Sequence, residues 1–277
     1  MKNRGGFSNF YDLKRSECKM RVMTFNLRSD SIFDGKNRWN SRKEIVYDIL
    51  DKYACDIIGL QEVTLKMHAD LENKLHDYQI VGQARSKKFF VEHNNILVSK
   101  RHKILDQETF WLSNQPKKIG SSIWYSIFPR ICTTAKIQLE EGMIVRVYNT
   151  HLDCYLSPAR GYGLKKIMRY IEKQQEFEKL PVILMGDFNA NPNHRLIKGF
   201  FEGELNTQQL IAVQEIDRSI YQQATMGGFK DRHHGMHLDY IFVSPEYEVL
   251  RTQIVKDNVN GRFPSDHYPL LADVCLI

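Results

Sequence analysis

An apolar, strand-like run that stops abruptly at polar residues recurs along this chain, and it limits the fold more than any other feature. Residues 181–189 read PVILMGDFN, in which Asp187 and Asn189 follow the apolar run two positions apart. Residues two apart in an extended segment point the same way, so both side chains face one place. Other runs carry polar residues at an end in the same manner, at Asn26, Glu62, His151 with Asp153, Asp239, and Asp266 with His267. Loops at strand ends commonly hold functional groups, so we expect these residues to share one site.

The rest of the pattern alternates between helical and extended segments. Apolar residues recur at helical spacing in residues 40–52, 65–76 and 157–179. Extended segments dominate residues 78–150 and return near the C-terminus, and no repeat or Pro/Gly-rich linker divides the chain. We therefore predict an α/β (α+β) fold of packed sheets covered by helices, in one domain at residues 20–277. Residues 1–19 are expected to form a poorly ordered leader.

Charge and cysteine content narrow the class of protein. The chain has 277 residues, a net charge of +6 and a pI near 8.9, which favours anionic partners such as phosphates or nucleic acid. Five scattered cysteines without a C-x-x-C pair favour neither a disulfide framework nor a zinc cluster. No apolar stretch resembles a secretion signal or a membrane span. These features predict a cytoplasmic protein without a membrane partner, and a monomer is the default assumption.

The strand-end residues fit the chemistry of phosphate esters. Glu62, Asn26 and Asp266 offer the hard oxygen ligands that Mg²⁺ or Mn²⁺ prefers. Such an ion would polarise a phosphoryl oxygen and offset developing charge. The sequence therefore predicts a divalent-metal site formed by these three residues.

The other strand-end residues suit proton transfer and charge stabilisation. Asp187 could take a proton from water, while Asn189 holds the nucleophile or a phosphate oxygen in line. His267, paired with Asp239, would stay protonated and stabilise negative charge in the transition state. His151 could act in the same way from the opposite side. Together these residues predict metal-assisted hydrolysis of a phosphoester by water.

The same segments resemble the endonuclease/exonuclease/phosphatase superfamily, which includes exonuclease III-like and DNase I-like nucleases, deadenylases and inositol phosphatases. The matching segments occur in the family's order across residues 20–276: TFNLR, IIGLQEV, NTHLD, GDFNANP, HLDYIFVS and PSDHYPL. Any one of them is a weak signal, whereas all six in order are a strong one. The FNLR opening, with TFWLS and PRICTTAKI, most resembles a bacterial subgroup of small cytoplasmic proteins.

The resemblance implies a DNase I-like four-layer αββα sandwich with its site at one edge of the two sheets. It also implies a divalent metal held chiefly by Glu62, with Asp187 as the base and Asn189 as its partner. An Asp239–His267 pair would bind phosphate.

Further residues are candidates for substrate binding. Arg28 and Arg130 lie beside the site-bearing segments and suit bidentate contact with phosphate, and Arg42 is a weaker candidate. Asp153 shares a face with His151 and is also assigned to the substrate. Trp39 is a candidate for stacking on a base or a sugar, a role also open to Trp124, whereas Trp111 is expected to pack in the core. A loop with His233, His234 and His237 is interpreted as a solvated segment beside the site rather than as a zinc site.

Three functions remain open from the sequence. The preferred one is a Mg²⁺- or Mn²⁺-dependent phosphoesterase acting on a small phosphorylated metabolite, a lipid head group or a nucleotide. The alternative is a nuclease for DNA or RNA, although no basic stripe with interleaved aromatic residues is long enough to follow a nucleic-acid backbone. The third is a binding protein that has kept the fold without the chemistry. The substrate and the number of metal ions do not follow from the sequence.

Overall fold

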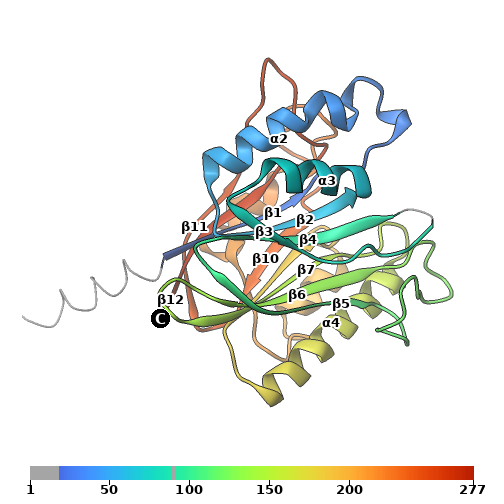
Figure 1. Ribbon diagram of the computed structural model, residues 1–277. Helices are drawn as coiled ribbons and strands as arrows, with labels where there is room; N and C mark the ends of the chain where they lie inside the picture. The colour runs from blue at the N-terminus through green and yellow to red at the C-terminus, as the bar shows by residue number, and fades with distance from the viewer. Residues whose placement is uncertain (1–18, 89–90) are drawn as a thin grey trace, which may run out of the picture.

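Two six-stranded sheets lie face to face between helices, as Figure 1 shows for residues 19–88 and 91–277, the part of the chain that the computed structural model describes. The first sheet runs in the order β11 (Tyr247–Ile254), β12 (Leu270–Leu276), β1 (Lys19–Asn26), β2 (Ile57–Thr64), β4 (Glu92–Ser99) and β3 (Tyr78–Val81). The second runs in the order β5 (Lys103–Trp111), β6 (Ile131–Gln138), β7 (Ile144–His151), β8 (Val182–Asp187), β10 (Asp239–Val243) and β9 (Ile211–Ala212).

Helices cover the outer face of each sheet because each helix has one apolar side to bury. The first sheet is covered by α2 (Trp39–Tyr53) and α3 (Leu65–Lys74), and the second by α4 (Ser157–Phe177) and α5 (Arg195–Phe201). Three short 3₁₀ helices are η1 (Ile32–Asn37), η2 (Val213–Ile216) and η3 (Arg218–Gln222). The layer order of helix, sheet, sheet and helix confirms the four-layer sandwich that the sequence predicts.

The two sheets approach each other most closely where β2 meets β7 and β8. A Cβ on Gly59 of β2 would lie 2.8 Å from Met185 Sδ and 2.9 Å from the side chain of Asn149, so only glycine fits there. Asn149 of β7 is fully buried and bonds across to the first sheet: its Nδ2 donates to Leu60 O (2.9 Å) and to Asn95 O (2.8 Å). Buried amides need such partners, so this residue ties the two sheets together.

The register of the strands brings the polar strand ends to one edge of the sandwich. β1 and β2 are parallel neighbours, as are β7 and β8, so their carboxyl ends meet at the same edge. β10 runs antiparallel to β8 and starts at this edge, which places Asp239 opposite Asp187. His151 is opposite Asp187 on the other side of β8. β12 is antiparallel to β1, so the segment before it, with Asp266 and His267, approaches the end of β1.

Most predicted elements are present, and the elements that were not predicted are short. The helices expected at residues 40–52, 65–76 and 157–179 are observed as α2, α3 and α4. The chain between β8 and β10 forms α5, β9, η2 and η3, which the periodicity did not predict because each spans seven residues or fewer. The predicted leader at residues 1–19 lies outside the described residues except for Lys19, which is already in β1.

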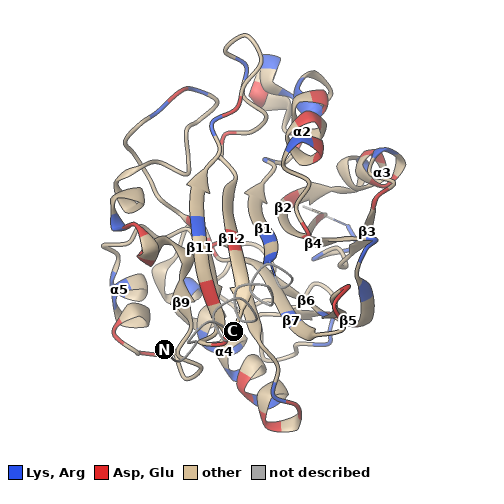
Figure 2. Cartoon of the chain, turned by 90° about the vertical axis from the view of Figure 1, so that its left-hand side faces the viewer, with Lys and Arg blue, Asp and Glu red and all other residues tan. Residues whose placement is uncertain are grey.

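Charged residues are mixed rather than segregated on the side where β1 starts. In Figure 2, blue and red segments alternate over the helices and loops, and the described residues form no continuous basic band on the face in view. Among residues 19–88 and 91–277, no helix combines the length and apolarity needed to cross a membrane.

Candidate active site

Glu62 reaches the site edge through an irregularity in β2. The pairing of β2 with β4 shifts register between Leu60 and Val63, and Glu62 has a φ of +59°, which is uncommon for a residue with a side chain. Bulges of this kind re-aim a side chain next to a functional site. The backbone N–H of Ser29 donates to Glu62 Oε2 (2.9 Å), which holds the re-aimed carboxylate in place.

Asn26 joins the end of β1 to two carboxylates from different sheets. Its Nδ2 donates to Glu62 Oε1 (3.1 Å) and to Asp187 Oδ2 (3.0 Å), while its Oδ1 accepts from the backbone N–H of Arg28 (2.9 Å). Residues separated by 161 positions in the chain are thus in direct contact.

Asp187 lies at the centre of the cluster and is almost completely buried. Its Oδ1 accepts from the backbone N–H of Asn189 (2.8 Å), whose φ of +49° is also left-handed. Its Oδ2 lies 3.6 Å from His151 Nε2 and 3.8 Å from His267 Nε2. The side-chain amide of Asn189 donates to Leu152 O (3.1 Å), so Asn189 fixes the turn that follows β8.

His267 and Asp239 form the pair that the sequence predicts. His267 Nδ1 is 2.9 Å from Asp239 Oδ2, which leaves Nε2 facing Asp187. Asp239 Oδ1 is buried and has no hydrogen-bond partner among the described residues. Such an acceptor usually has an unseen water or ion beside it.

The pKa values of the cluster differ strongly because the environments differ. Burial alone would lower the pKa of His267, but the charge and hydrogen bond of Asp239 outweigh it and raise that pKa well above the ordinary value. Burial and then the positive charge of Arg130 lower the pKa of His151 to about 4. At neutral pH His267 is therefore a cation and His151 is neutral. The low pKa of His151 favours a neutral, hydrogen-bonding role for this residue over the charge-stabilising role proposed from the sequence.

The carboxylates divide in the same way. Burial would raise the pKa of Glu62, but His151 and the hydrogen bonds from Ser29 and Asn26 lower it to about 2. At neutral pH the uncharged His151 no longer stabilises the Glu62 carboxylate, whereas the hydrogen bonds from Ser29 and Asn26 still do. Burial and then the charge of Asp239 raise the pKa of Asp187. Glu62 is thus ionised at neutral pH, and Asp187 is a carboxylate with increased affinity for a proton.

Two neighbouring groups of atoms could hold a divalent cation. In the first, the Glu62 carboxylate accepts from Asn26 Nδ2 (3.1 Å), and the nearby Asp266, whose pKa is raised by burial, lies 3.8 Å from Arg28 Nε. Ligand atoms of Asp187, Asp239 and His267 also lie within 4.8 Å of one another. The protonated imidazole of His267 competes with a cation in the second group, so the donor chemistry fits Mg²⁺ or Mn²⁺ best at Glu62.

The three arginine candidates differ in burial and in hydrogen-bond partners. Arg28 donates from Nε and Nη2 to Asp34 (3.1 and 3.0 Å), and it is half-buried. Arg130 is buried, and its Nε has no hydrogen-bond partner among the described residues. Arg42 instead bonds to backbone carbonyl oxygens, among them Leu27 O and Pro264 O, and so holds the loops that carry the site.

Two of the predicted substrate contacts are wrong. Trp39 is fully buried at the start of α2 and its Nε1 donates to Asp70 Oδ2 (2.7 Å), so its ring packs in the core. Asp153 is also buried, and its carboxylate accepts from Ser126 Oγ (2.7 Å) and from the backbone N–H groups of Tyr155 (2.9 Å) and Leu156 (2.7 Å). It organises the turn before α4 rather than presenting free oxygens to a substrate.

The histidine loop is solvated at two of its three histidines, and the interpretation as a solvated segment does not hold for His237. His233 and His234 are exposed, whereas His237 is fully buried between Gln214 (3.1 Å) and Gln223 O (3.1 Å). None of the three belongs to the metal-capable group found among the described residues.

Sequence reasoning missed two residues beside the cluster. Arg85 is buried, pairs with Glu92 (2.9 Å) and lies over the ring of Phe128, which also faces Arg130. Ser265 Oγ donates to Asn26 O (2.7 Å) and so fastens the end of β1. Arg85 lies between two extended segments, where no periodic pattern points to it. Ser265 directly precedes Asp266 in the segment PSDHYPL, so the motif could have identified it.

Comparison with known proteins gives one family and several relatives. The family model described as "Endonuclease/Exonuclease/phosphatase family" matches residues 23–267. Nocturnin of Rattus norvegicus is 25% identical over an alignment 297 positions long, gaps included, which covers 94% of this chain and 66% of that protein, so the chain spans just under two thirds of this relative.

Solved structures share the fold over nearly the whole chain. A family protein from Bacteroides vulgatus is 28% identical with a TM-score of 0.79, covering 94% of this chain and 99% of the other. A mannosyl-6-phosphatase from Bacteroides thetaiotaomicron is 24% identical with a TM-score of 0.83, covering 93% of this chain and 100% of the other.

Proposed function

Because the chain belongs to the endonuclease/exonuclease/phosphatase family, we propose that it is a divalent-metal-dependent phosphoesterase that drives water onto the phosphorus of a small phosphorylated substrate. The observation that carries this proposal is the convergence of Glu62, Asn26, Asp187 and the Asp239–His267 pair at one sheet edge. These groups come from both sheets and could not be brought together by local sequence alone.

The metal would be held by Glu62, with Asn26 and Asp266 beside it. When bound, a Mg²⁺ or Mn²⁺ ion would polarise the phosphoryl oxygen and offset the charge that develops on it. The low pKa of Glu62, about 2, supports this assignment because the carboxylate is ionised throughout the neutral range. Asn26 would turn its amide oxygen toward the ion in place of the Nδ2–H that now donates to Glu62 Oε1.

Asp187 would act as the general base. Burial raises its pKa, which increases its affinity for the proton of the attacking water. Its Oδ1 is held by the backbone N–H of Asn189 and its Oδ2 by Asn26, so the carboxylate is fixed before substrate arrives. Fixed geometry of this kind contributes to catalysis because less ordering remains at the transition state.

His267 and the neutral His151 would divide the contacts with phosphate. His267 is a cation whose Nδ1 is bound by Asp239, so its Nε2–H can donate to a phosphoryl oxygen and stabilise negative charge. Neutral His151 would donate or accept one hydrogen bond. Arg28 and Arg130 remain proposed contacts for the phosphate; Arg130 Nε makes no hydrogen bond among the described residues and lies 3.9 Å from Asp153 Oδ2.

A nuclease is the second candidate. The net charge of +6 favours it, since phosphate contacts draw affinity from basic residues. The small number of large exposed aromatic side chains among the described residues weighs against a long nucleic-acid track. Activity on an oligonucleotide that falls steeply with added salt would support it.

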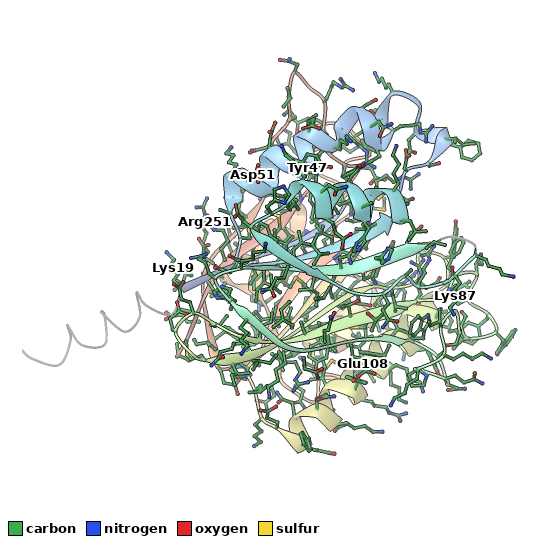
Figure 3. The ribbon with its side chains drawn as sticks, in the orientation of Figure 1. Lys19, Tyr47, Asp51, Lys87, Glu108 and Arg251 are labelled. Carbon is green, nitrogen blue, oxygen red and sulfur yellow. The ribbon has the colours of Figure 1, made fainter. Side chains whose placement is uncertain are left out.

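The test is a panel of sugar phosphates, nucleotides and oligonucleotides incubated with purified protein and Mn²⁺, with and without EDTA. We expect hydrolysis that EDTA abolishes and that Asp187→Asn reduces by at least about 10³-fold. Asp51→Asn is the matched control, because this exposed acid lies on α2 on the side of the molecule where Lys19 starts β1, as Figure 3 shows, whereas the site lies where β1 ends. Hydrolysis that survives both EDTA and Asp187→Asn would refute the proposal.

A further inference from the structure

The end of the molecule that carries the candidate site also carries most of its strongly exposed apolar side chains. Seven large apolar side chains among the described residues are at least as exposed as that of Tyr155, at 62%. Five of them lie on loops at the site end, and we call these five the apolar rim: Ile32, Phe33, Trp124, Ile127 and Tyr155. The other two are Phe177, which ends α4, and the C-terminal Ile277. Single exposed apolar residues are ordinary, whereas a group of them at one place marks an interaction surface.

The first part of the rim follows the end of β1. Ile32 and Phe33 belong to η1, the first element after β1. Arg28 Nε and Nη2 donate to Asp34 (3.1 and 3.0 Å), so η1 is held close to the strand that it follows. Ile32 is nevertheless 72% exposed and Phe33 90% exposed. Both side chains therefore project into solvent beside the end of β1.

The second part of the rim lies on the other sheet. Trp124 and Ile127 are in the connection between β5 and β6, which is at the site end because β6 runs antiparallel to β7. This connection packs against the loop that follows β7, where the ring centroids of Phe128 and Tyr155 are 6.2 Å apart. Trp124, Ile127 and Tyr155 thus stand on two loops that are in contact with each other.

The candidate site lies between the two parts of the rim. Asn26, at the end of β1, and His151, at the end of β7, lie 3.0 and 3.6 Å from Asp187 Oδ2. The chain continues from the first of these strands into η1 and from the second into the loop with Tyr155. In Figure 1, the η1 loop and the β5–β6 connection project at the end of the sandwich where β1 ends. A single broad surface that touched both parts of the rim would therefore lie over the site.

Basic residues accompany the rim. Residues 82–91, between β3 and β4, and residues 112–130, between β5 and β6, contain six Lys or Arg residues and no Asp or Glu. Four of the six are exposed lysines that form no ion pair with a described residue: Lys87, Lys88, Lys117 and Lys118. Figure 3 labels Lys87 at the end of the molecule opposite Lys19, which starts β1. Lysines without acidic partners attract a negatively charged surface.

We propose that this end of the protein docks on an anionic lipid bilayer and that the phosphorylated substrate is the head group of a lipid in that bilayer. A bilayer surface presents phosphates above an apolar layer, so it can contact the lysines and the apolar rim at the same time. Aromatic side chains such as Trp124 are favourable at the boundary between these layers. The choice of substrate rests on the proposed phosphoesterase function, whereas the docking does not.

Other occupants match these side chains less completely. Single-stranded nucleic acid would stack on Phe33 and Trp124 but would leave Ile32 and Ile127 in water. A second copy of the chain would bring the same lysines together, and like charges repel. A membrane partner was not expected from the sequence, because no segment is apolar enough to span a bilayer. Docking at a bilayer surface needs only exposed side chains on loops.

Sedimentation with lipid vesicles in the presence of EDTA tests the docking without any hydrolysis. We expect tighter binding to vesicles of phosphatidylglycerol and phosphatidylcholine than to vesicles of phosphatidylcholine alone. Phe33→Ala and Trp124→Ala should each weaken this binding about tenfold, since each removes a large side chain from the apolar layer. Phe177→Ala is the matched control, because Phe177 is equally exposed, at 89%, but ends α4, which leads away from the site end.

Two results would overturn the docking. The first is an absence of binding to the anionic vesicles, or wild-type binding by both Phe33→Ala and Trp124→Ala. The second is binding of an oligothymidylate, weakened in Phe33→Ala and Trp124→Ala, by a protein that does not bind vesicles. That result would assign the rim to nucleic acid.

Hydrolysis tests the lipid substrate separately from the docking. With Mn²⁺, we expect phosphate release from vesicles that contain phosphatidate or a phosphatidylinositol phosphate. Phe33→Ala should lower this rate about tenfold at low vesicle concentration, as it lowers binding, and should leave hydrolysis of glycerol 3-phosphate unchanged. Hydrolysis of glycerol 3-phosphate without hydrolysis of either lipid would overturn the lipid substrate and leave the phosphoesterase intact. Vesicle binding without hydrolysis of any ester would support the docking and count against the proposed function.

Discussion

Replacement of Asn149 by alanine should destabilise the protein by about 3 kcal/mol. Its amide donates to Leu60 O and Asn95 O, and its Oδ1 accepts from Gln61 Nε2 (2.7 Å). All of these groups lie in the fully buried space between the sheets. A buried hydrogen bond contributes roughly 1 kcal/mol net, so three lost bonds give about 3 kcal/mol. Gln61 keeps its bonds to Thr24 Oγ1 and Gly59 O, which limits the loss on its side.

Asn149→Asp distinguishes lost hydrogen bonds from lost volume. Aspartate has nearly the shape of asparagine, but its carboxylate would face two carbonyl oxygens that can only accept. It should therefore destabilise at least as much as Asn149→Ala. If packing volume alone mattered, Asn149→Asp would resemble the wild type.

Urea unfolding followed by tryptophan fluorescence measures both effects, because Trp39 and Trp111 are buried and lose their environment on unfolding. Asn40→Ala is the matched control, since Asn40 is exposed and meets only Lys66 Nζ (2.7 Å) at the surface. The control should change the free energy of unfolding by no more than about 0.5 kcal/mol. A loss below about 1 kcal/mol in Asn149→Ala would show that this residue does not tie the sheets together.

Three further predictions concern the site edge. Asp239→Asn removes the charge that raises the pKa of His267. In the pH profile of kcat/KM, the fall at alkaline pH should therefore begin at a lower pH than in the wild type, and an unshifted alkaline limb would contradict the pairing. Gly186→Ala would place a Cβ 1.9 Å from Thr150 O at a φ of +146°, so we expect hydrolysis to fall roughly 100-fold through displacement of the adjacent Asp187 carboxylate, and wild-type rates would disprove this. The pKa of Glu62 is depressed to about 2 in the folded protein, so its ionised carboxylate contributes stability that is lost as pH falls from about 4.5 through 2. In acid unfolding, Glu62→Gln should lose less free energy of unfolding across that window than the wild type. An equal loss would contradict the assigned pKa.

The strand ends could be predicted from the sequence because their signal is local. An apolar run with period two that ends at Asp187 and Asn189 already fixes which way both side chains point. The parallel pairing of β7 with β8 and the antiparallel pairing of β10 then bring His151 and Asp239 to the same place. The order of the six motifs supplied the rest, so the prediction of one shared site did not depend on exact strand boundaries.

Other features depend on contacts between distant segments and left no local signal. The register shift that turns Glu62 into the site arises from pairing with β4, not from residues next to it. The sequence offered Trp39 as a candidate for stacking, but α2 turns its ring toward the core, where it is fully buried. Asp153 shares its strand direction with His151, yet the turn before α4 takes up both of its oxygens.

Titration with Mn²⁺ of the wild type, Glu62→Gln and Asp187→Asn tests the shared site most directly, with calorimetry for binding and hydrolysis for activity. We predict that Glu62→Gln weakens Mn²⁺ binding at least about tenfold and loses hydrolysis with it. Asp187→Asn should still bind Mn²⁺ but not hydrolyse the ester. Wild-type Mn²⁺ affinity in Glu62→Gln, or full hydrolysis by Asp187→Asn, would contradict a single site in which these two carboxylates have separate roles.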